Sequence, residues 1–194
     1  MVINYLGGGS FKLQSGETSI LIDPENNRFK ADAVLRTLSP AASFAAGSEP
    51  EAQSEIGFSG EYEIKGIEIL GVPVADESSD KFVKTVYSVN WEDIRLVFLG
   101  HLSKPPSDDI IDKLGDPDVL FLPIGGEHFL EPEVAAKLAK QFEPSFVIPT
   151  FYKKPADFLK AMGQKVDFQE KLVFKKKDLE PEGNRVVLLE AKNT

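Results

Sequence analysis

The stretch that decides the fold runs from Arg95 to Tyr152: RLVFLGHLSKPPSDDIIDKLGDPDVLFLPIGGEHFLEPEVAAKLAKQFEPSFVIPTFY. It contains three short runs that are apolar on both faces and bounded by turn residues, at Leu96–Leu99, Val119–Ile124 and Phe146–Ile148. Such runs are typical of interior strands that are covered on both sides. Between them, apolar residues recur at spacings of three and four, which predicts helices at Ser107–Leu114 and Pro132–Phe142. The stretch therefore predicts two strand–helix–strand units, whose strands pair in parallel through right-handed crossovers.

The carboxyl ends of these strands are the predicted place for a functional site. In open sheets of this kind, ligands bind beyond the carboxyl ends of the parallel strands. The three ends carry Gly100-His101, Gly125-Gly126 and Thr150-Phe151. Ser107 is a favoured residue type at a helix N-cap, and Pro132 suits a first helical turn, so both helix starts have local support.

The composition limits the range of functions. The chain has 194 residues without a linker or repeat, which favours a single domain over residues 1–194. No run approaches the roughly 18 apolar residues of a membrane-spanning helix, and no basic segment precedes an apolar run at the N-terminus. We therefore expect a cytoplasmic protein without a membrane partner. With 22 basic and 31 acidic residues and a net charge of −9, a nucleic-acid partner is not expected. The basic cluster Lys175–Lys177 follows a predicted strand and is interpreted as a solvated strand end.

Short strands are predicted on both sides of the central stretch, because apolar residues alternate between turn residues there. The predicted strands are Val2–Leu6, Phe11–Leu13, Thr18–Asp23, Ala33–Thr37, Gly60–Ile64, Ile67–Val72, Thr85–Asn90, Lys165–Phe168, Lys171–Phe174 and Arg185–Glu190. A further helix is predicted at Pro155–Met162, whereas Glu49–Glu55 is interpreted as a turn or weak helix and Ala75–Lys81 as a polar loop. Two blocks of strands with later helices predict two sheets packed face to face with helices outside.

Six motifs, taken in order, resemble the metallo-β-lactamase fold, and above all its small, single-domain metal-dependent hydrolase branch with the ascorbate-phosphate-lactonase-like proteins. They are YLGGGSF (Tyr5–Phe11), ILIDP (Ile20–Pro24), GEYEIKGIEILGVP (Gly60–Pro73), FLGHLSKP (Phe98–Pro105), DVLFLPIGG (Asp118–Gly126) and FVIPTFYK (Phe146–Lys153). The resemblance covers nearly the whole chain. It implies an α/β protein with a four-layer αββα sandwich, built from two mixed sheets with helices outside. It also implies an active site at one edge between the sheets.

The metal-ligand positions of that family carry other residue types in this chain. The family's first histidine matches Gly8, and its metal-bridging aspartate matches His101. Its Thr-His-x-His-x-Asp-His motif falls on Thr37 to Ser43, where the ligand and catalytic positions are held by Leu38, Pro40, Ala42 and Ser43. The remaining histidine positions match Lys104, Phe151 and the segment Val74-Ala75-Asp76. The resemblance therefore implies a scaffold whose metal ligands are lost.

The ligand requirements of zinc determine what these replacements imply for metal binding. Zinc requires about three or four nitrogen, oxygen or sulfur donors at roughly 2.0–2.3 Å, and hydrolysis requires a water molecule acidified by the metal. Leucine, alanine, proline and phenylalanine side chains have no donor atom, and the whole chain has two histidines and no cysteine. A histidine-rich dinuclear site cannot be assembled from these residues, so we expect no zinc cofactor.

Three residues are candidates for a different catalytic site. His101 follows a strand inside the expected cleft, where it is either a general base or a simply hydrogen-bonded histidine. His128 follows the Gly-Gly turn, at the cleft rim or in a surface loop, and Asp23 either points into the cleft or makes an ordinary Asp-Pro turn. Together they have the residue types of a two-histidine, one-carboxylate metal site, although their spacing does not indicate one.

Other polar motifs have simpler interpretations. Ser39 and Ser43 would need an adjacent base to act as nucleophiles, and the chain has no Gly-x-Ser-x-Gly elbow. The glycines of Gly7–Gly9 are interpreted as a tight hairpin turn rather than a phosphate cradle, because they precede a strand and no P-loop lysine follows.

These observations lead to hypotheses of different classes. The first is a catalytically degenerate metallo-β-lactamase-fold protein, without zinc, that binds a small molecule or a protein partner. The alternative is a hydrolase of the ester, lactone or phosphoester type with a nonstandard site around His101. A structural subunit of a homo-oligomer is the third. The predicted ligand cleft, which Leu38, Pro40 and Phe151 are expected to fill, consists of Gly8, Asp23, Leu38, Pro40, His101, Lys104, Gly125, Gly126 and Phe151.

Overall fold

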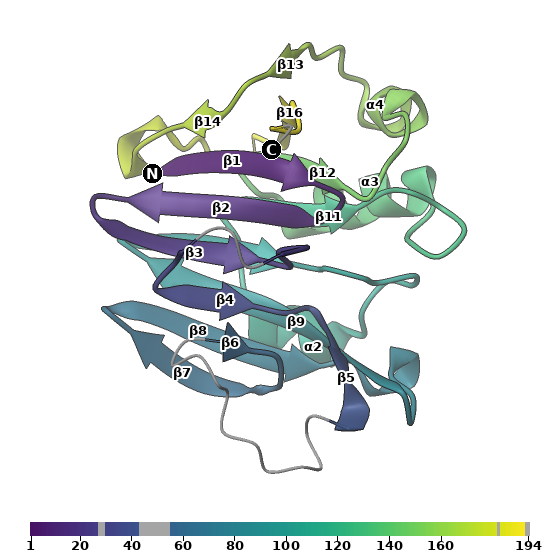
Figure 1. Cartoon of the computed structure of the whole chain (residues 1–194). Coiled ribbons are helices and arrows are strands. Elements are labelled where there is room, and N and C mark those ends of the chain that lie inside the picture. Colours follow the sequence, from purple (N-terminus) through teal and green to yellow (C-terminus); the bar gives the residue numbers. More distant parts are fainter. Residues whose placement is uncertain (27–29, 43–54, 182, 193–194) are drawn as a thin grey trace.

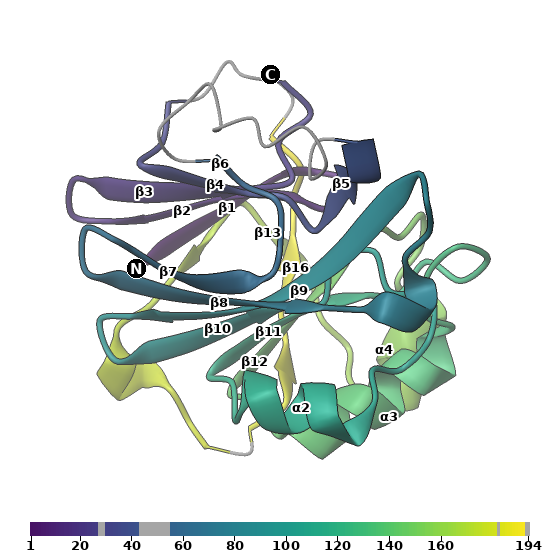
Figure 2. The ribbon, with the colours of Figure 1, turned by 90° about the horizontal axis from the view of Figure 1, so that it is seen from below.

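Two β-sheets lie face to face in the computed structural model, which describes residues 1–26, 30–42, 55–181 and 183–192 (Figure 1). Helices α2 (Asp108–Leu114), α3 (Pro132–Phe142) and α4 (Ala156–Met162) lie together on the outer side of one sheet (Figure 2). The predicted fold class, an α/β sandwich with two mixed sheets and helices outside, is confirmed. Two short 3-10 helices, η1 (Ala75–Glu77) and η2 (Lys176–Asp178), lie in connections.

The first sheet has six strands in the order β14-β1-β2-β3-β4-β6. Its centre is the predicted meander of β1 (Val2–Gly7), β2 (Ser10–Ser15) and β3 (Thr18–Ile22), which pair antiparallel. β4 (Ala33–Leu35) and β6 (Glu55–Ile56) continue it in parallel, and β14 (Leu172–Val173) pairs with β1. Alternate residues of β1 and β2 are buried, which is why a period of two is visible in the sequence.

The second sheet has eight strands, and seven follow the order β15-β12-β11-β10-β9-β8-β7. These strands are β15 (Arg185–Val186), β12 (Phe146–Thr150), β11 (Val119–Pro123), β10 (Ile94–Phe98), β9 (Phe82–Trp91), β8 (Ile67–Pro73) and β7 (Gly60–Ile64). β10, β11 and β12 pair in parallel, as the two strand–helix–strand units predict. The eighth strand, β5 (Leu38–Pro40), pairs with the start of β9. A separate pair is formed by β13 (Phe168–Gln169) and β16 (Leu188–Leu189).

Two apolar cores hold these layers together. The first lies between the sheets, where Phe121 contacts Phe11 edge to face at a ring distance of 4.9 Å and stacks on Phe98 at 4.3 Å. The second lies between the eight-stranded sheet and the three helices, and it includes Leu120 and Leu138. All five residues of β11 are buried, because one face of the strand packs in the first core and the opposite face packs in the second core. This explains why the central runs are apolar without alternation.

Several element boundaries differ from the sequence predictions. β5 and β6 were not predicted, because each is too short to show a period. β9 begins at Phe82 rather than Thr85, since β5 pairs with Phe82–Lys84. The predicted strand Ala33–Thr37 ends at Leu35, and Ser107 takes the N-cap position of α2 without a side-chain capping hydrogen bond. Most of Glu49–Glu55 lies outside the described residues. No helix in the described part of the chain is long and apolar enough to span a membrane.

Candidate functional site

Three polar side chains from separate segments meet where β3 of one sheet and β10 of the other end. Asp23 directly follows β3, Thr37 lies between β4 and β5, and His101 lies in the turn after β10. The Thr37 hydroxyl donates to Asp23 Oδ2 at 2.5 Å, and the Thr37 amide donates to Asp23 Oδ1 at 2.7 Å. His101 Nδ1 lies 2.7 Å from the same hydroxyl oxygen. The result is a hydrogen-bonded chain that runs Asp23–Thr37–His101.

The position of the protons in this chain follows from the single hydrogen of the threonine hydroxyl. When Asp23 is ionised, Thr37 donates to it, and His101 must then donate its Nδ1–H to Thr37. When Asp23 is protonated, the chain can reverse, so that Asp23 donates to Thr37 and Thr37 donates to His101 Nδ1. Thr37 therefore couples the protonation of the carboxyl group to the tautomer of the imidazole.

Burial sets the charge state of both ends of the chain. Burial raises the pKa of the Asp23 carboxyl to about 6, although the hydrogen bonds from Thr37 and the nearby charge of Arg36 oppose this rise. Burial, reinforced by the nearby positive charge of Lys84, lowers the pKa of His101 to about 4. At pH 7 the site therefore contains an aspartate carboxylate and a neutral imidazole. A neutral imidazole can accept a proton, which is the property that a general base requires.

Phe151 occupies the space beside this chain. Its ring lies 4.6 Å from the His101 ring and stacks on Phe129 at 4.4 Å. Its amide donates to the carbonyl of Gly8, and its backbone has a positive φ of 53°. The ring lies so close to the backbone of Gly9 that a Cβ atom there would be 2.0 Å from Cζ of Phe151, so this turn requires glycine. The cavity that remains, between Phe151 and the polar side chains of Asp23 and Thr37, has a volume of about 10 Å³.

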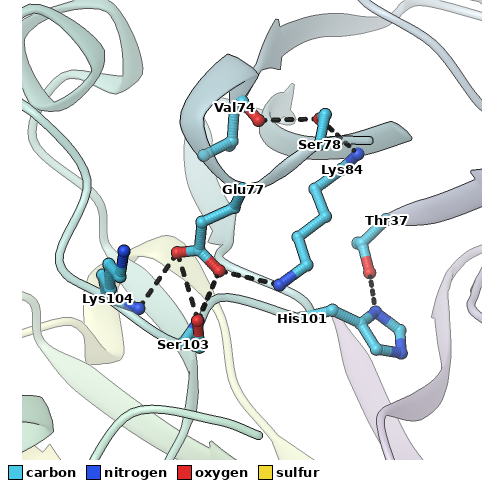
Figure 3. Close-up of polar contacts among 8 residues, drawn as sticks. All are labelled: Thr37, Val74, Glu77, Ser78, Lys84, His101, Ser103 and Lys104. Carbon is cyan, nitrogen blue, oxygen red and sulfur yellow. Dashed lines mark hydrogen bonds and ion pairs between the residues drawn. The ribbon is translucent and has the colours of Figure 1, made fainter. Parts of the chain in front are cut away.

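A second polar network fixes the loop that follows His101 (Figure 3). The Glu77 carboxylate accepts hydrogen bonds from Lys84 Nζ at 2.7 Å, from the amide and hydroxyl of Ser103, and from the amide of Lys104. Burial acts to raise the pKa of Glu77, but the hydrogen bonds from Lys84, Ser103 and Lys104 outweigh it and lower the pKa. Lys84 thus neutralises a carboxylate that is only 4% exposed, and it contributes positive charge beside His101.

A pocket of about 410 Å³ opens to the surface on the other side of Phe151. The predicted cleft residues Gly125 and Gly126 line it, together with Phe151. The exposed His128 also lines this pocket, whereas Asp23 lines the small inner cavity. The structure therefore separates these two candidates, and the described residues contain no cluster of three or more histidine, aspartate or glutamate side chains that would hold a metal ion.

The other predicted cleft residues lie around this arrangement in different ways. Leu38 and Pro40 lie on β5, and Pro40 is exposed. Of the three side chains that were expected to fill the cleft, only Phe151 lines the small cavity. Lys104 contributes its backbone amide to Glu77, while its side chain is exposed. Ser39 is buried at 5% exposure, and Ser43 lies outside the described residues.

Three residues of the site were not identified from the sequence: Thr37 as the link of the chain, and the pair Glu77 and Lys84. Thr37 and His101 are 64 positions apart, and no local pattern marks such a contact. Glu77 lies in a segment interpreted as an exposed polar loop, yet its carboxylate is buried by the loop after β10. The sequence did contain a signal for Lys84. A lysine on a strand with apolar neighbours needs a partner for its charge when it is buried.

The residues present do not fit a zinc ion. Zinc needs three or four nitrogen, oxygen or sulfur donors around one point. The hydrogen-bonded chain supplies one carboxylate and one imidazole, and the ring of Phe151 lies against that imidazole. The positive charge of Lys84 beside His101 would also repel a cation.

The fold and the position of this site, at the edge between two mixed sheets, define the class of protein. Residues 2–151 match the family model described as the beta-lactamase superfamily domain. Because this match spans most of the chain, the protein belongs to the β-lactamase superfamily, and its fold is the metallo-β-lactamase fold.

Individual relatives agree with this assignment. A UPF0173 metal-dependent hydrolase of Methanopyrus kandleri is 28% identical over 131 residues, which are 63% of this chain and 57% of that protein. The chain thus spans little more than half the length of that relative. A protein of the metallo-β-lactamase superfamily from Thermotoga maritima superposes with a TM-score of 0.77 over 97% of both chains, at 23% identity. The metallo hydrolase Igni18 from Ignicoccus hospitalis superposes with a TM-score of 0.66 over 90% of this chain and 99% of its own, at 20% identity.

Proposed function

We propose that this member of the superfamily has lost the zinc site and acts as a binding module for a small molecule or a protein partner. The observation that carries this proposal is the position of Phe151. Its ring lies against Gly9, His101 and Phe129 and leaves about 10 Å³ beside Asp23 and Thr37. A substrate would have to displace the ring to reach these groups.

The chemistry of the donor atoms supports the same proposal. Among the positions that match the family's ligands, Gly8, Leu38, Pro40, Lys104 and Phe151 have no side chain that donates an electron pair to zinc at neutral pH, and His101 is the one imidazole that remains. The positive charge that a metal would bring is supplied instead by Lys84, which pairs with the buried Glu77 carboxylate. The Glu77 carboxylate is therefore compensated without a metal.

The surface pocket beside Phe151 is the proposed place for a small ligand. Its volume of about 410 Å³ lies within the range of roughly 300–1,000 Å³ that is usual for small-molecule sites. It combines the aromatic faces of Phe129 and Phe151 with the charged side chains of Lys153, Lys154 and Glu131. The acidic net charge of −9 supports a partner other than nucleic acid.

A hydrolase is the second candidate function. It is favoured by the relative named as a metal-dependent hydrolase and by the Asp23–Thr37–His101 chain, which presents a neutral imidazole at pH 7. In this case His101 would act as the base that activates water, with Asp23 holding its tautomer through Thr37.

Metal content tests the proposed loss of the zinc site, and ester hydrolysis by the wild type compared with H101A tests the hydrolase. We would purify the untagged protein without chelator, measure bound metal by elemental analysis, and record the melting temperature with and without added zinc. We expect only trace metal, below about 0.1 equivalent per protein chain, because few donor atoms are present. Added zinc should leave the melting temperature unchanged, since a metal that does not bind does not stabilise the fold. Stoichiometric metal in the wild type that is lost in H101A and D23A would overturn the proposal and favour the hydrolase.

A further inference from the structure

The small cavity behind Phe151 has an unusual lining for an interior space. It lies against the aromatic core between the sheets, yet three of its residues are polar: Asp23, Thr37 and Thr150. Its volume of about 10 Å³ is roughly the space that the centre of one water molecule needs. Apolar cavities of this size stay empty, whereas polar ones bind water when two to four hydrogen-bonding partners are available.

Thr150 supplies the second observation. Its side chain is at the end of β12 and is 3% exposed, and its hydroxyl has no hydrogen-bond partner among the described residues. A buried hydroxyl without a partner destabilises a fold, so native proteins rarely contain one. Asp23 lines the same cavity, and each of its oxygens accepts one hydrogen bond from Thr37, which leaves further lone pairs free to accept.

We propose that this cavity is a binding site for one small hydrogen-bonding molecule, which is water in the resting protein, held between the Thr150 hydroxyl and the Asp23 carboxyl group. The water donates one hydrogen to Asp23 and forms a second hydrogen bond with Thr150. It thereby connects the chain Asp23–Thr37–His101 to β12 and satisfies the Thr150 hydroxyl.

Phe151 lies between this site and the surface pocket. Phe151 lines both the inner cavity and the surface pocket of about 410 Å³, so its ring forms the wall between them. Removing the ring would join the two spaces. It would leave a planar space between Gly9 and Phe129 with the Thr150 and Asp23 groups at its inner end. The enlarged site should therefore bind a small planar aromatic molecule that carries a hydroxyl group, such as phenol.

The first test is a matched pair of substitutions at Thr150. Thr150→Val keeps the shape and removes the hydroxyl, whereas Thr150→Ser keeps the hydroxyl. In high-resolution crystal structures, we expect a water peak about 2.7–3.2 Å from Thr150 Oγ1 and from an Asp23 oxygen in the wild type. We expect this water to persist in Thr150→Ser and to be absent from Thr150→Val, whose melting temperature should not exceed that of the wild type. A dry wild-type cavity, together with a higher melting temperature for Thr150→Val, would overturn the proposal.

The second test measures ligand binding to Phe151→Ala by NMR titration with phenol and with benzene. We expect phenol to bind about fivefold more tightly than benzene, which is the difference that one buried hydrogen bond provides. The preference should fall in the double variant Phe151→Ala/Thr150→Val, in which only Asp23 remains to bind the phenol hydroxyl. Equal affinity for both compounds in Phe151→Ala, or binding of neither, would overturn the proposal. Should Phe151→Ala not fold, Phe151→Val serves for the same titration. Neither test depends on metal content or hydrolysis, so the water site and the proposed function can fail separately.

Discussion

Asp23 and His101 share the hydroxyl of Thr37, and their pKa values are displaced in opposite directions. The pKa of Asp23 is raised to about 6, so as the pH falls from 6 toward 4 the folded state takes up a proton before the unfolded state does. This uptake stabilises the fold. The pKa of His101 is lowered to about 4, so between pH 6.5 and 4 the unfolded state is protonated first, which destabilises the fold. The two contributions fall in the same pH window and oppose each other.

Substituting either residue should therefore reveal the contribution of the other. Relative to the wild type, we expect H101N to gain stability as the pH falls from 6.5 to 4, and D23N to lose it. Each change should be on the order of 2–3 kcal/mol, since one pKa unit corresponds to about 1.4 kcal/mol and solvent access reduces the effect. Urea unfolding at several pH values measures both differences, and the titration of all other carboxylates cancels in the comparison. Parallel stability curves for the three proteins would contradict this interpretation.

Phe151 is the residue whose position most changes the interpretation of the site. A phenylalanine with a positive φ is uncommon, because its Cβ crowds the backbone in the left-handed region. The conformation is held by the hydrogen bond to Gly8 and by the close contact with Gly9 and Gly125. The sequence predicted that Phe151, Leu38 and Pro40 together fill the cleft. Of these three residues, only Phe151 lines the small cavity in the structure.

At the scale of elements, the network around Glu77 fixes η1 to the loop after β10. Glu77 is held by Lys84 from β9 and by the Ser103 and Lys104 amides, so three segments depend on one carboxylate. Its lowered pKa means that this stabilisation is present above the ordinary pKa of a glutamate and is lost as the pH falls through the lower, folded-state value.

Removing the lysine should destabilise this connection strongly. We expect K84M to lower the free energy of unfolding by about 3 kcal/mol, because it leaves a carboxylate that is 4% exposed without its counter-charge. The double variant K84M/E77Q should recover much of that loss, since the amide oxygen can still accept from Ser103. Hydrogen exchange at the Ser103 and Lys104 amides should accelerate in K84M.

The exposed pair of Lys65 and Asp32 provides the control for this experiment. Lys65 is 62% exposed, so K65M should change the free energy of unfolding by less than about 1 kcal/mol. A similar cost for K84M and K65M would show that the burial of Glu77 has no energetic importance.

At the scale of the whole molecule, β11 contributes side chains to both cores, as β10 and β12 also do. Leu120 faces the helices and Phe121 faces the other sheet, and neither is more than 2% exposed. We expect L120A and F121A each to lower the free energy of unfolding by about 3–4 kcal/mol, because each leaves a cavity in a closed core. Chemical denaturation measures both. Q14A, on the exposed face of β2, should change stability by no more than about 0.5 kcal/mol. A small effect at Leu120 would mean that the helices do not close the second core.

The sequence by itself determined the architecture. The parallel unit of β10, β11 and β12, both of its helices and the N-terminal meander were all visible, because strand and helix periods are local properties of neighbouring residues. The two blocks of strands led to the prediction of two sheets packed face to face, and the family resemblance implied the same sandwich. The resemblance also led to the prediction that the zinc-ligand residue types are replaced, because the ability of a side chain to donate electrons does not depend on the fold.

Only the tertiary structure decided how the cleft is occupied. Thr37 joins Asp23, 14 positions away, to His101, 64 positions away, and contacts at such separations leave no local pattern. The same reason hid the burial of Glu77 by a distant loop. β5 was hidden because it has only three residues, and it forms where β9 offers a partner. His128 and Asp23 looked alike as candidates, but they line spaces on opposite sides of the Phe151 ring. Side-chain packing between distant segments, and not residue type, made that distinction.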